Sequence, residues 1–515
     1  MTTTNLPGTS LAVPPQSGEG WWGGLNDDGP RMPFGRAPLS RDLARDLSSN
    51  QGVPLLLSSQ GRFVWSDAPF AFEVDGAGLR LNGEAPLTLE EGHGTLRGAF
   101  LAASARHFPP SGALPDERLF TRPQYNTWIE HGYGGTQAGV LAYARGILEH
   151  GFPSGVLMID DNWHRGYGHW DFDRERFPDP GALVRQLQDM GFPVMLWVCP
   201  FVSPDSEEFR WLEKRGLLLL DAGGNVALRK WWNGYSALLD LTHPGAVNWM
   251  NEGLDRLQAD YGVDGFKFDA GDPIFYRTDD RMVQPGGPAA QAEAWGRLGL
   301  RFPLNEYRAC WKLGGQALAQ RLKDKGHSWG DSGLASLIPS GLAQGLIGHP
   351  YTCADMVGGG DIETFIKPDF QMDTELFVRY AQAAALFPML QFSTAPWRVL
   401  DAEHLAVCRR VAELHVRHAD EIMTLARHAA QTGEPIIRSL EYVFPHQGYA
   451  EVRDQFLLGD DLLVAPVLTQ GAREREVVFP PGRWRGDDGS VVEGPARVVV
   501  PAPLERLPHY RKEIS

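Results

Sequence analysis

The chain has 515 residues, of which 43% are hydrophobic and 22% are charged, a composition typical of folded globular proteins and not of disordered ones. At roughly 100 to 200 residues per domain, this length predicts two to four structural units. The 48 Lys and Arg residues against 64 Asp and Glu residues give a formal net charge of -16. The basic residues form no stripe, so neither nucleic acid nor a membrane surface is expected as a partner.

The cellular location is predicted from the absence of targeting patterns. No apolar run approaches the ~18 residues of a membrane span, and no basic residue precedes the short apolar stretch near the N-terminus. We therefore expect a cytoplasmic protein. The four cysteines are far apart and form no CxxC pair, which predicts buried free thiols and not zinc or redox sites. They are Cys199, Cys310, Cys353 and Cys408.

The first part of the chain alternates Gly, Pro and Asn turns with short segments of period two, such as Gly61–Trp65 and Phe70–Val74. This pattern predicts strands, so we expect an N-terminal β domain over residues 1–118. Beyond about Gly433 similar segments return between Pro and Gly turns. They predict a C-terminal β domain over residues 431–515.

The middle of the chain repeats short apolar runs followed by amphipathic segments, the pattern of βα units on a parallel sheet. In one unit the apolar run 155–161 ends in acidic residues, and Asp179–Pro180 supplies the cap and the first position of a helix. The number of runs is near eight. We therefore expect a (β/α)8 barrel over residues 119–430. The pattern alone does not exclude a doubly wound sheet with a similar number of strands. The predicted strands are 125–130, 155–161, 192–200, 264–269, 328–331, 351–355 and 390–393.

A Gly-rich and Trp-rich stretch interrupts this rhythm at about residues 203–243, and we expect it to form an insertion over the barrel mouth. Trp231 and Trp232 lie in this insertion. An exposed indole is a good stacking surface for a sugar ring, although two core tryptophans fit the sequence nearly as well.

Acidic residues recur at the ends of the predicted strands, which form the active-site face of a barrel. Cleavage of a glycosidic bond needs one ionised and one protonated carboxyl group at such a face. Because strand residues alternate sides, Lys267 and Asp269 share one face and can point into the pocket. A barrel-core ion pair without chemistry is the alternative. The acidic residues are Asp160, Asp161, Asp269, Asp331 and Asp355.

Two further side chains are candidates for the same site. Asp331 has small neighbours and the ring of Trp329 beside it, which can raise its pKa by desolvation, but an Asp here can equally cap the helix that follows. Arg308 can donate hydrogen bonds to sugar hydroxyl groups, although most arginines form surface ion pairs.

Metal and phosphate chemistry are not expected. The acidic pair Asp160 and Asp161 lies near His164 and His169, but the spacing matches neither HxH nor HExxH. The glycines of Val357–Asp361 are not followed by the Lys-Ser/Thr of a phosphate loop, so they predict a flexible active-site loop. We expect no metal and no cofactor.

Several motifs together resemble glycoside hydrolase family 31, and the similarity extends from about Asn50 to the C-terminus. Within the family, the chain is most similar to the myogenesis-regulating glycosidase group of α-galactosidases, through the segments 126–130, 231–234, 355–359 and 391–393. The family motifs are Arg-Phe-Pro at 176–178, Gly-Phe-Lys-Phe-Asp at 265–269, Trp-Gly-Asp at 329–331, Gly-His-Pro-Tyr-Thr-Cys-Ala-Asp at 348–355 and Asp-Gln-Phe-Leu-Leu-Gly-Asp-Asp-Leu-Leu-Val-Ala-Pro at 454–466.

The resemblance implies a barrel between two β-sandwich domains and a retaining glycosidase that releases terminal α-linked galactose from oligosaccharides or glycosides. By the same resemblance, Asp269 matches the nucleophile and Asp331 the general acid/base. The residues 21–28 are expected to help close the pocket. The implied sugar-binding residues are one of Asp160 and Asp161, with Asp161 favoured, together with Trp232, Lys267 and Arg308, and with Asp355 at the edge.

The choice of sugar stays open between several members of the family. Where α-glucosidases of the family carry a histidine after the eighth strand, this sequence has Ser393, which weakens the case for glucose. An α-glucosidase, an α-xylosidase and an α-N-acetylgalactosaminidase remain alternatives, because a few loop side chains decide hydroxyl recognition. A non-catalytic carbohydrate-binding protein is the alternative from another class. The oligomeric state is also open, a homo-oligomer included.

Overall fold

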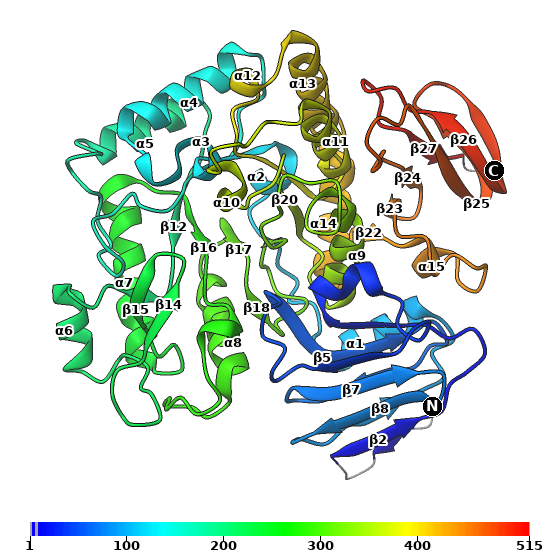
Figure 1. The fold of residues 1–515 in the computed structure, drawn as a ribbon, viewed down its shortest axis with the longest axis horizontal. Helices are drawn as coiled ribbons and strands as arrows, with labels where there is room; N and C mark the ends of the chain where they lie inside the picture. The colour runs from blue at the N-terminus through cyan, green and yellow to red at the C-terminus, as the bar shows by residue number, and fades with distance from the viewer. Residues whose placement is uncertain (1–2, 6–8, 514–515) are drawn as a thin grey trace.

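A computed structural model describes residues 3–5 and 9–513 of the chain (Figure 1). The first residues of the expected N-terminal domain, 1–2 and 6–8, and the last of the C-terminal one, 514–515, lie outside the described part. Among the described residues, no helix combines the length and the apolar character needed to cross a membrane.

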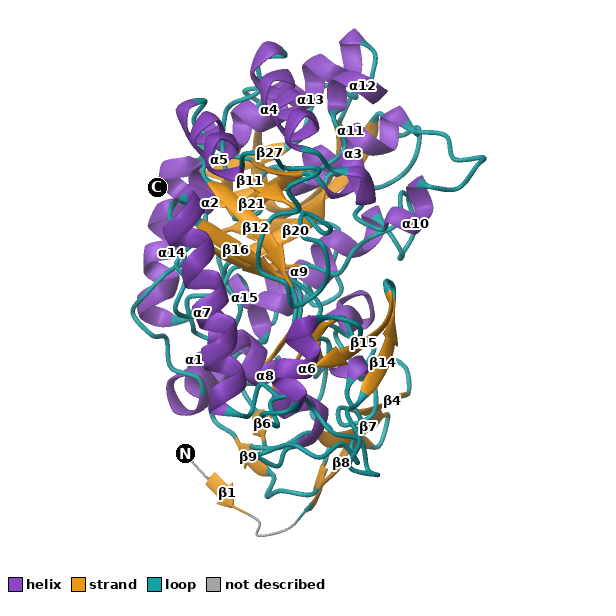
Figure 2. Ribbon diagram, turned by 90° about the vertical axis from the view of Figure 1, so that its left-hand side faces the viewer, coloured by secondary structure: helices purple, strands orange, loops and turns teal. Residues whose placement is uncertain are grey.

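Eight parallel strands close a barrel at the centre of the molecule, with helices around it (Figure 2). The closed order confirms the predicted (β/α)8 barrel and excludes a doubly wound sheet. The strands, in barrel order, are β10 (Gln124–Asn126), β11 (Leu157–Ile159), β12 (Val194–Val198), β16 (Gly265–Phe268), β17 (Asn305–Tyr307), β19 (Gln320–Arg321), β20 (Thr352–Met356) and β21 (Met389–Phe392).

The predicted strand at 328–331 is wrong. This segment is a loop in which the backbone bonds locally, with Ser328 N donating to Gly326 O and Gly333 N donating to Gly330 O. The sixth barrel strand is β19, which lies earlier in the chain and pairs with β17 and β20. The end of the sixth strand therefore carries the residues just after Arg321, and not Asp331.

Sequence signals account well for the helices around the barrel. In α5 the predicted cap Asp179 accepts a hydrogen bond from Ala182 N at 2.9 Å, and Leu183 and Leu187 are buried against the barrel. The helices of the barrel are α2 (Arg118–Thr121), α3 (Trp128–His131), α4 (Gln137–Glu149), α5 (Pro180–Asp189), α7 (Pro244–Tyr261), α8 (Gly287–Gly299), α9 (Leu337–Leu346), α10 (Ile362–Phe365), α11 (Thr374–Ala384), α12 (Pro396–Val399), α13 (Ala402–Arg417) and α14 (Ala419–Thr432). Short 3-10 turns are η2 (Gly132–Gly134), η3 (Pro273–Phe275) and η4 (Leu334–Ser336).

Two sheets that share one hydrophobic core form the N-terminal part, which lies below the barrel in Figure 1. One sheet also includes β18, a short strand that follows the fifth barrel strand and pairs in parallel with β5. The first sheet contains β2 (Ser10–Val13), β8 (Gly78–Gly83), β7 (Phe70–Asp75) and β4 (Leu39–Asp42); the second contains β1 (Thr3–Asn5), β9 (Thr88–Glu90), β6 (Phe63–Trp65), β5 (Gln51–Ser58), β18 (Cys310–Trp311) and β3 (Trp21–Leu25). Helices α1 (Leu96–His107) and η1 (Asn26–Arg31) accompany them.

The insertion and the C-terminal part add two smaller sheets. The insertion folds as a three-stranded sheet of β13 (Phe201–Val202), β15 (Gly234–Leu238) and β14 (Leu228–Trp231), with α6 (Glu207–Glu213). The C-terminal sheet has its own core and stands beside the barrel. Its strands are β22 (Ile437–Arg438), β23 (Phe456–Leu458), β24 (Leu462–Val464), β27 (His509–Lys512), β25 (Glu474–Gly486) and β26 (Val491–Pro501), and α15 (Leu440–Val443) precedes β23. All four cysteines are buried and free, as expected.

Candidate active site

Asp269 directly follows β16 at the C-terminal end of the barrel and is 7% exposed. One carboxylate oxygen accepts a hydrogen bond from Trp197 Nε1 at 2.7 Å, and the other forms an ion pair with Arg308 Nε at 3.1 Å. Burial raises the pKa of Asp269, but Arg308 and Lys267 outweigh burial and hold this pKa well below its ordinary value. Asp269 is therefore an ionised carboxylate with a fixed orientation.

The second carboxylate of this group belongs to Asp324, in the loop that follows β19. It forms ion pairs with Arg321 at 2.7 Å and with Arg308 at 3.3 Å. Its side chain is 27% exposed and borders a cavity of about 610 Å³, so a ligand can reach it. A single guanidinium group, that of Arg308, thus bridges Asp269 and Asp324.

The charge on Asp324 depends on these neighbours. Burial raises its pKa, whereas Arg321 and then Arg308 lower it, and the negative charge of Asp269 raises it again. The balance leaves the pKa of Asp324 below its ordinary value. Because opposing charges set this balance, moving one arginine away from Asp324 changes its protonation.

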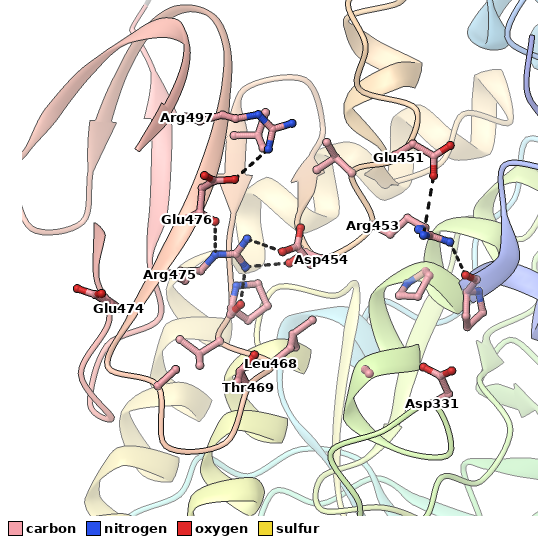
Figure 3. A pocket seen from close by; sticks show the side chains of 18 of the residues that line it. Asp331, Glu451, Arg453, Asp454, Leu468, Thr469, Glu474, Arg475, Glu476 and Arg497 are labelled. Carbon is pink, nitrogen blue, oxygen red and sulfur yellow. Dashed lines mark hydrogen bonds and ion pairs between the residues drawn. The ribbon is translucent and has the colours of Figure 1, made fainter. Parts of the chain in front are cut away.

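Asp331 is not part of this group. It is exposed in the loop before η4, and no hydrogen bond or ion pair joins it to any residue that the structure describes. It borders the cavity that Asp324 reaches, and also a second cavity of about 780 Å³ between the barrel and the C-terminal sheet. Figure 3 shows Asp331 at one edge of this second cavity, apart from Arg475 and its partner Asp454. The structure brings Asp269 together with Asp324 and not with Asp331.

Lys267 and Asp160 form a buried ion pair, with 2.6 Å between Nζ and the carboxylate. Strand alternation turns Lys267 and Asp269 toward the same side. The positive charge of Lys267 therefore acts on the carboxylates of both Asp160 and Asp269. The second oxygen of Asp160, Oδ1, accepts a hydrogen bond from Asp161 N at 2.8 Å, so both of its carboxylate oxygens have partners. Asp161 is the one of the two that is available to bind a ligand.

Asp161 has an unusual ionisation. Its Oδ2 accepts a hydrogen bond from Asn233 Nδ2 at 2.7 Å, while its Oδ1 has no partner among the described residues. Burial, followed by the negative charge of Asp160, raises the pKa of Asp161 to about 7. A buried acceptor without a partner is suited to a hydroxyl group of a sugar.

The two neighbouring tryptophans of the insertion have different environments. Trp231 is 5% exposed and stacks on Phe201, with 4.1 Å between ring centroids, so it belongs to the core of the insertion. Trp232 is 40% exposed, and the guanidinium carbon of Arg308 lies 5.0 Å from its ring centroid. Of the pair, only Trp232 offers an open ring face beside the carboxylates.

Asp355 lies deeper than the expected edge of a sugar pocket. It is fully buried, pairs with Arg321 at 2.6 Å and accepts a hydrogen bond from Lys325 N at 2.8 Å. Burial raises its pKa to about 6. Its contacts hold Arg321 and the loop that carries Asp324.

The sequence patterns did not indicate Asp324 and Arg321. Asp324 is one of the two carboxylates of the site, and Arg321 forms an ion pair with it. The only local signal for them is weak: Leu318, Ala319 and Leu322 flank the polar pair Gln320–Arg321 just before Lys323 and Asp324. Trp197 could also have been predicted as a site residue, because side chains alternate along the predicted strand 192–200 and this alternation determines the face of the strand on which Trp197 lies. Among the described residues, no three His, Cys, Asp or Glu side chains gather as metal ligands would.

Two family models match the chain. The model of the TIM-barrel domain of glycosyl hydrolases family 31 matches residues 119–425, and the model of the family's C-terminal domain matches residues 433–514. Together they cover the barrel that carries the carboxylates and the sheet beside it.

Among characterised proteins, the chain is 37% identical to the myogenesis-regulating glycosidase of Mus musculus over 400 residues, which are 75% of this chain and 55% of that protein. It is 27% identical to alpha-glucosidase 2 of Bacillus thermoamyloliquefaciens over 411 residues, which are 74% and 51% of the two chains. The chain therefore spans about half the length of these relatives.

Solved structures show the same fold. A family 31 dextranase of Flavobacterium johnsoniae complexed with glucose has a TM-score of 0.86 at 20% identity and covers 99% of this chain and 67% of its own. An alpha-xylosidase from a soil metagenome complexed with xylose has a TM-score of 0.85 at 22% identity, covering 98% and 79%.

The ionisation of Asp161 is testable. In Asn233→Ala, the pKa of Asp161 should rise further above about 7, because the lost hydrogen bond stabilises the carboxylate form. A difference infrared titration of the carboxyl band measures this pKa, and Asp161→Asn assigns the band. Tyr167→Phe is the control, since its hydroxyl lies 3.4 Å from Asp161 and should matter less. A pKa that stays constant or falls in Asn233→Ala would contradict the assignment.

Proposed function

Because the chain belongs to glycosyl hydrolase family 31, we propose that it is a retaining α-glycosidase that releases terminal α-linked sugars, with galactose as the favoured sugar. The observation that carries this proposal is the bridging of Asp269 and Asp324 by Arg308 at the mouth of the barrel. This arrangement places an ionised carboxylate, Asp269, beside a second carboxyl group, Asp324, whose pKa depends on its arginine neighbours.

The reaction follows from this pair. Asp269 attacks the anomeric carbon while Asp324 donates its proton to the leaving oxygen, so that the glycosidic bond breaks and an ester to Asp269 forms. Water then attacks the same carbon, Asp324 accepts its proton, and the ester bond to Asp269 breaks. Two inversions at one carbon retain the α configuration.

Asp324 must carry a proton when the substrate is bound. Of the three ion pairs of Arg308, the one with Asp324, at 3.3 Å, is longer than those with Asp269 and Asp272, at 3.1 Å and 2.8 Å. Sugar hydroxyl groups that attract Arg308 away from Asp324 would remove a positive charge from it. The pKa of Asp324 then rises, although Arg321, which lowers it more than Arg308 does, stays paired with it at 2.7 Å.

Several side chains around the pair are suited to a sugar. Asp161 offers its unpartnered oxygen to a hydroxyl group, and Trp232 offers a ring face. At the end of the eighth strand, Ser393 is fully buried and accepts a hydrogen bond from Ile129 N at 2.7 Å. The Ser393 hydroxyl group is therefore bound by the main chain at Ile129, and the side chain is smaller than a histidine. This difference from the α-glucosidase pattern supports galactose over glucose.

A second sugar class is supported by the names of relatives. An alpha-glucosidase and the alpha-xylosidase XylQ of Lactiplantibacillus pentosus both match most of this chain. Glucose and xylose are therefore alternatives to galactose, and N-acetylgalactosamine stays an alternative on the sequence alone. A non-catalytic binding protein is less well supported, since burying two carboxylates in one site is costly unless they are used.

The roles of the aspartates predict distinct kinetic defects. Asp269→Ala should lose ~10³-fold or more in kcat on every substrate, because no nucleophile remains. Asp324→Ala should lose about 10²- to 10⁴-fold on a disaccharide but far less on a dinitrophenyl glycoside, which departs without a proton. Added azide should restore turnover of Asp324→Ala and give the α-glycosyl azide.

Asp331→Ala is the matched control in these assays, because Asp331 lies apart from the pair. Its rates on both substrates should stay within about threefold of the unmodified protein, as for most surface changes. If Asp331→Ala showed the leaving-group dependence and azide rescue while Asp324→Ala did not, Asp331 would be the acid and our assignment of Asp324 would be overturned.

The sugar preference is tested by comparing kcat/KM on four nitrophenyl glycosides under one set of conditions. We expect the α-galactoside to exceed the α-glucoside, the α-xyloside and the N-acetyl-α-galactosaminide by about tenfold or more, since a mismatched hydroxyl leaves buried polar groups unpaired. Preference for another of the four sugars would replace galactose. Release from none of them would argue against the glycosidase proposal.

A further inference from the structure

A buried glutamine of the N-terminal sheet contacts the main chain of both arginines that hold the carboxylates. Gln51 begins β5 and is 1% exposed. Its side-chain Nε2 donates hydrogen bonds to the carbonyl oxygens of Arg308 and Arg321, both at 3.0 Å. The two arginines follow or end neighbouring barrel strands, β17 and β19. One amide group therefore ties the ends of these strands together.

The orientation of this amide is fixed by its other partners. Nε2 has two hydrogens for three acceptors, so one hydrogen is shared with Gln320 Oε1, which also lies at 3.0 Å, while Oε1 accepts from Asn26 at 3.2 Å and from Gln344 at 2.5 Å. An amide offers hydrogens only from its nitrogen and lone pairs only from its oxygen. Rotating the group would place its oxygen against two carbonyl oxygens, so only one orientation satisfies the cluster.

The main chain around Gln51 is fixed to the same region. Cys310 N donates to Asn50 O at 2.9 Å, and Lys312 N donates to Gly52 O at 2.9 Å. The side chain of Asn50 donates to Asp272, which pairs with the guanidinium group of Arg308 at 2.8 Å. Consecutive residues of the N-terminal part thus hold Arg308 at its main chain and, through Asp272, at its guanidinium group.

We propose that Gln51 is a positioning residue for the catalytic pair. It sets the separation of Arg308 and Arg321, and these two arginines place and charge Asp269 and Asp324. The N-terminal sheet thereby controls the rate at which Asp269 attacks the anomeric carbon. This inference rests on the proposed function, because it assumes that Asp269 is a nucleophile.

The expected size of the effect follows from the geometry. Without its amide, the carbonyl groups of Arg308 and Arg321 lose a shared donor, and the two strand ends are free to separate. A displacement of ~1 Å at reacting groups can cost about 10²-fold in rate. We expect a loss in chemistry of between about tenfold and about 10²-fold in Gln51→Met, whose side chain keeps a similar length without the hydrogen bonds.

The test measures two quantities separately: the rate constant for labelling of Asp269 and the fraction of protein molecules that can be labelled. The probe is the 5-fluoro-α-glycosyl fluoride of the preferred sugar: Asp269 attacks the anomeric carbon, the carbon–fluorine bond there breaks, fluoride leaves, and the ester accumulates. Intact-protein mass gives the labelled fraction, and its time course gives the rate constant. Partial unfolding lowers the labelled fraction, whereas mispositioning lowers the rate constant.

In Gln51→Met we expect nearly complete labelling with a rate constant that is about tenfold to about 10²-fold lower. Gln344→Met is the matched control: it removes one hydrogen bond from the same buried cluster but does not contact either arginine. Its rate constant should stay within about twofold of the unmodified protein, as expected for a change away from the reacting groups. A rate constant in Gln51→Met equal to that of Gln344→Met would overturn the proposal.

Loss of the retaining mechanism and loss of the role of Gln51 give different results. If the unmodified protein is not labelled although it turns over glycosides, the retaining mechanism is lost. If it is labelled and Gln51→Met reacts at full rate, only the role of Gln51 is lost. Should Gln51→Met not fold, Gln51→Glu keeps the shape and replaces the donating nitrogen with oxygen. Failure of both variants to fold would also contradict the proposal, since Gln51 would then serve stability.

Discussion

Arg308 joins three carboxylates, and the remaining features of the site are arranged around this interaction. It pairs with Asp269, Asp272 and Asp324 within 3.3 Å, while its guanidinium carbon lies over the ring of Trp232. A guanidinium group is planar and carries donors in a fixed fork, so it can hold several acceptors in a defined arrangement where a lysine could not. These opposing charges orient the group and lower the pKa of Asp269 and Asp324, whereas burial raises the pKa of Asp272.

Three parts of the chain maintain this arrangement. The barrel supplies the carboxylates from the ends of its strands, the insertion supplies Trp232 and the Asn233 amide, and the N-terminal sheet holds Arg308 through Asn50 and Gln51. Residue Lys323 also pairs with Asp27 at 3.6 Å, which brings the segment 21–28 to the cavity beside Asp324. The site therefore depends on segments far apart in the sequence.

Local patterns in the sequence predicted the barrel, the helix cap at Asp179 and the position of Asp269, because strand alternation and capping act within a few residues. The sixth strand was missed for a physical reason. β19 has only two residues, and its Gln and Arg side chains point into a polar network instead of an apolar core, so it lacks the usual apolar run. Its absence moved the expected strand end from Asp324 to Asp331. The contacts of Gln51 with the two arginines span more than 250 residues and leave no local pattern.

The pairing of Asp269 with Asp324 is tested most directly by a crystal structure of the protein with an uncleaved thio-linked disaccharide. We predict that the two carboxyl groups lie about 5 to 5.5 Å apart, with Asp324 next to the bridging sulfur and Asp269 below the anomeric carbon. A separation of about 6.5 to 9.5 Å, which is typical of inverting enzymes, or Asp331 in place of Asp324 beside the sulfur, would contradict the account.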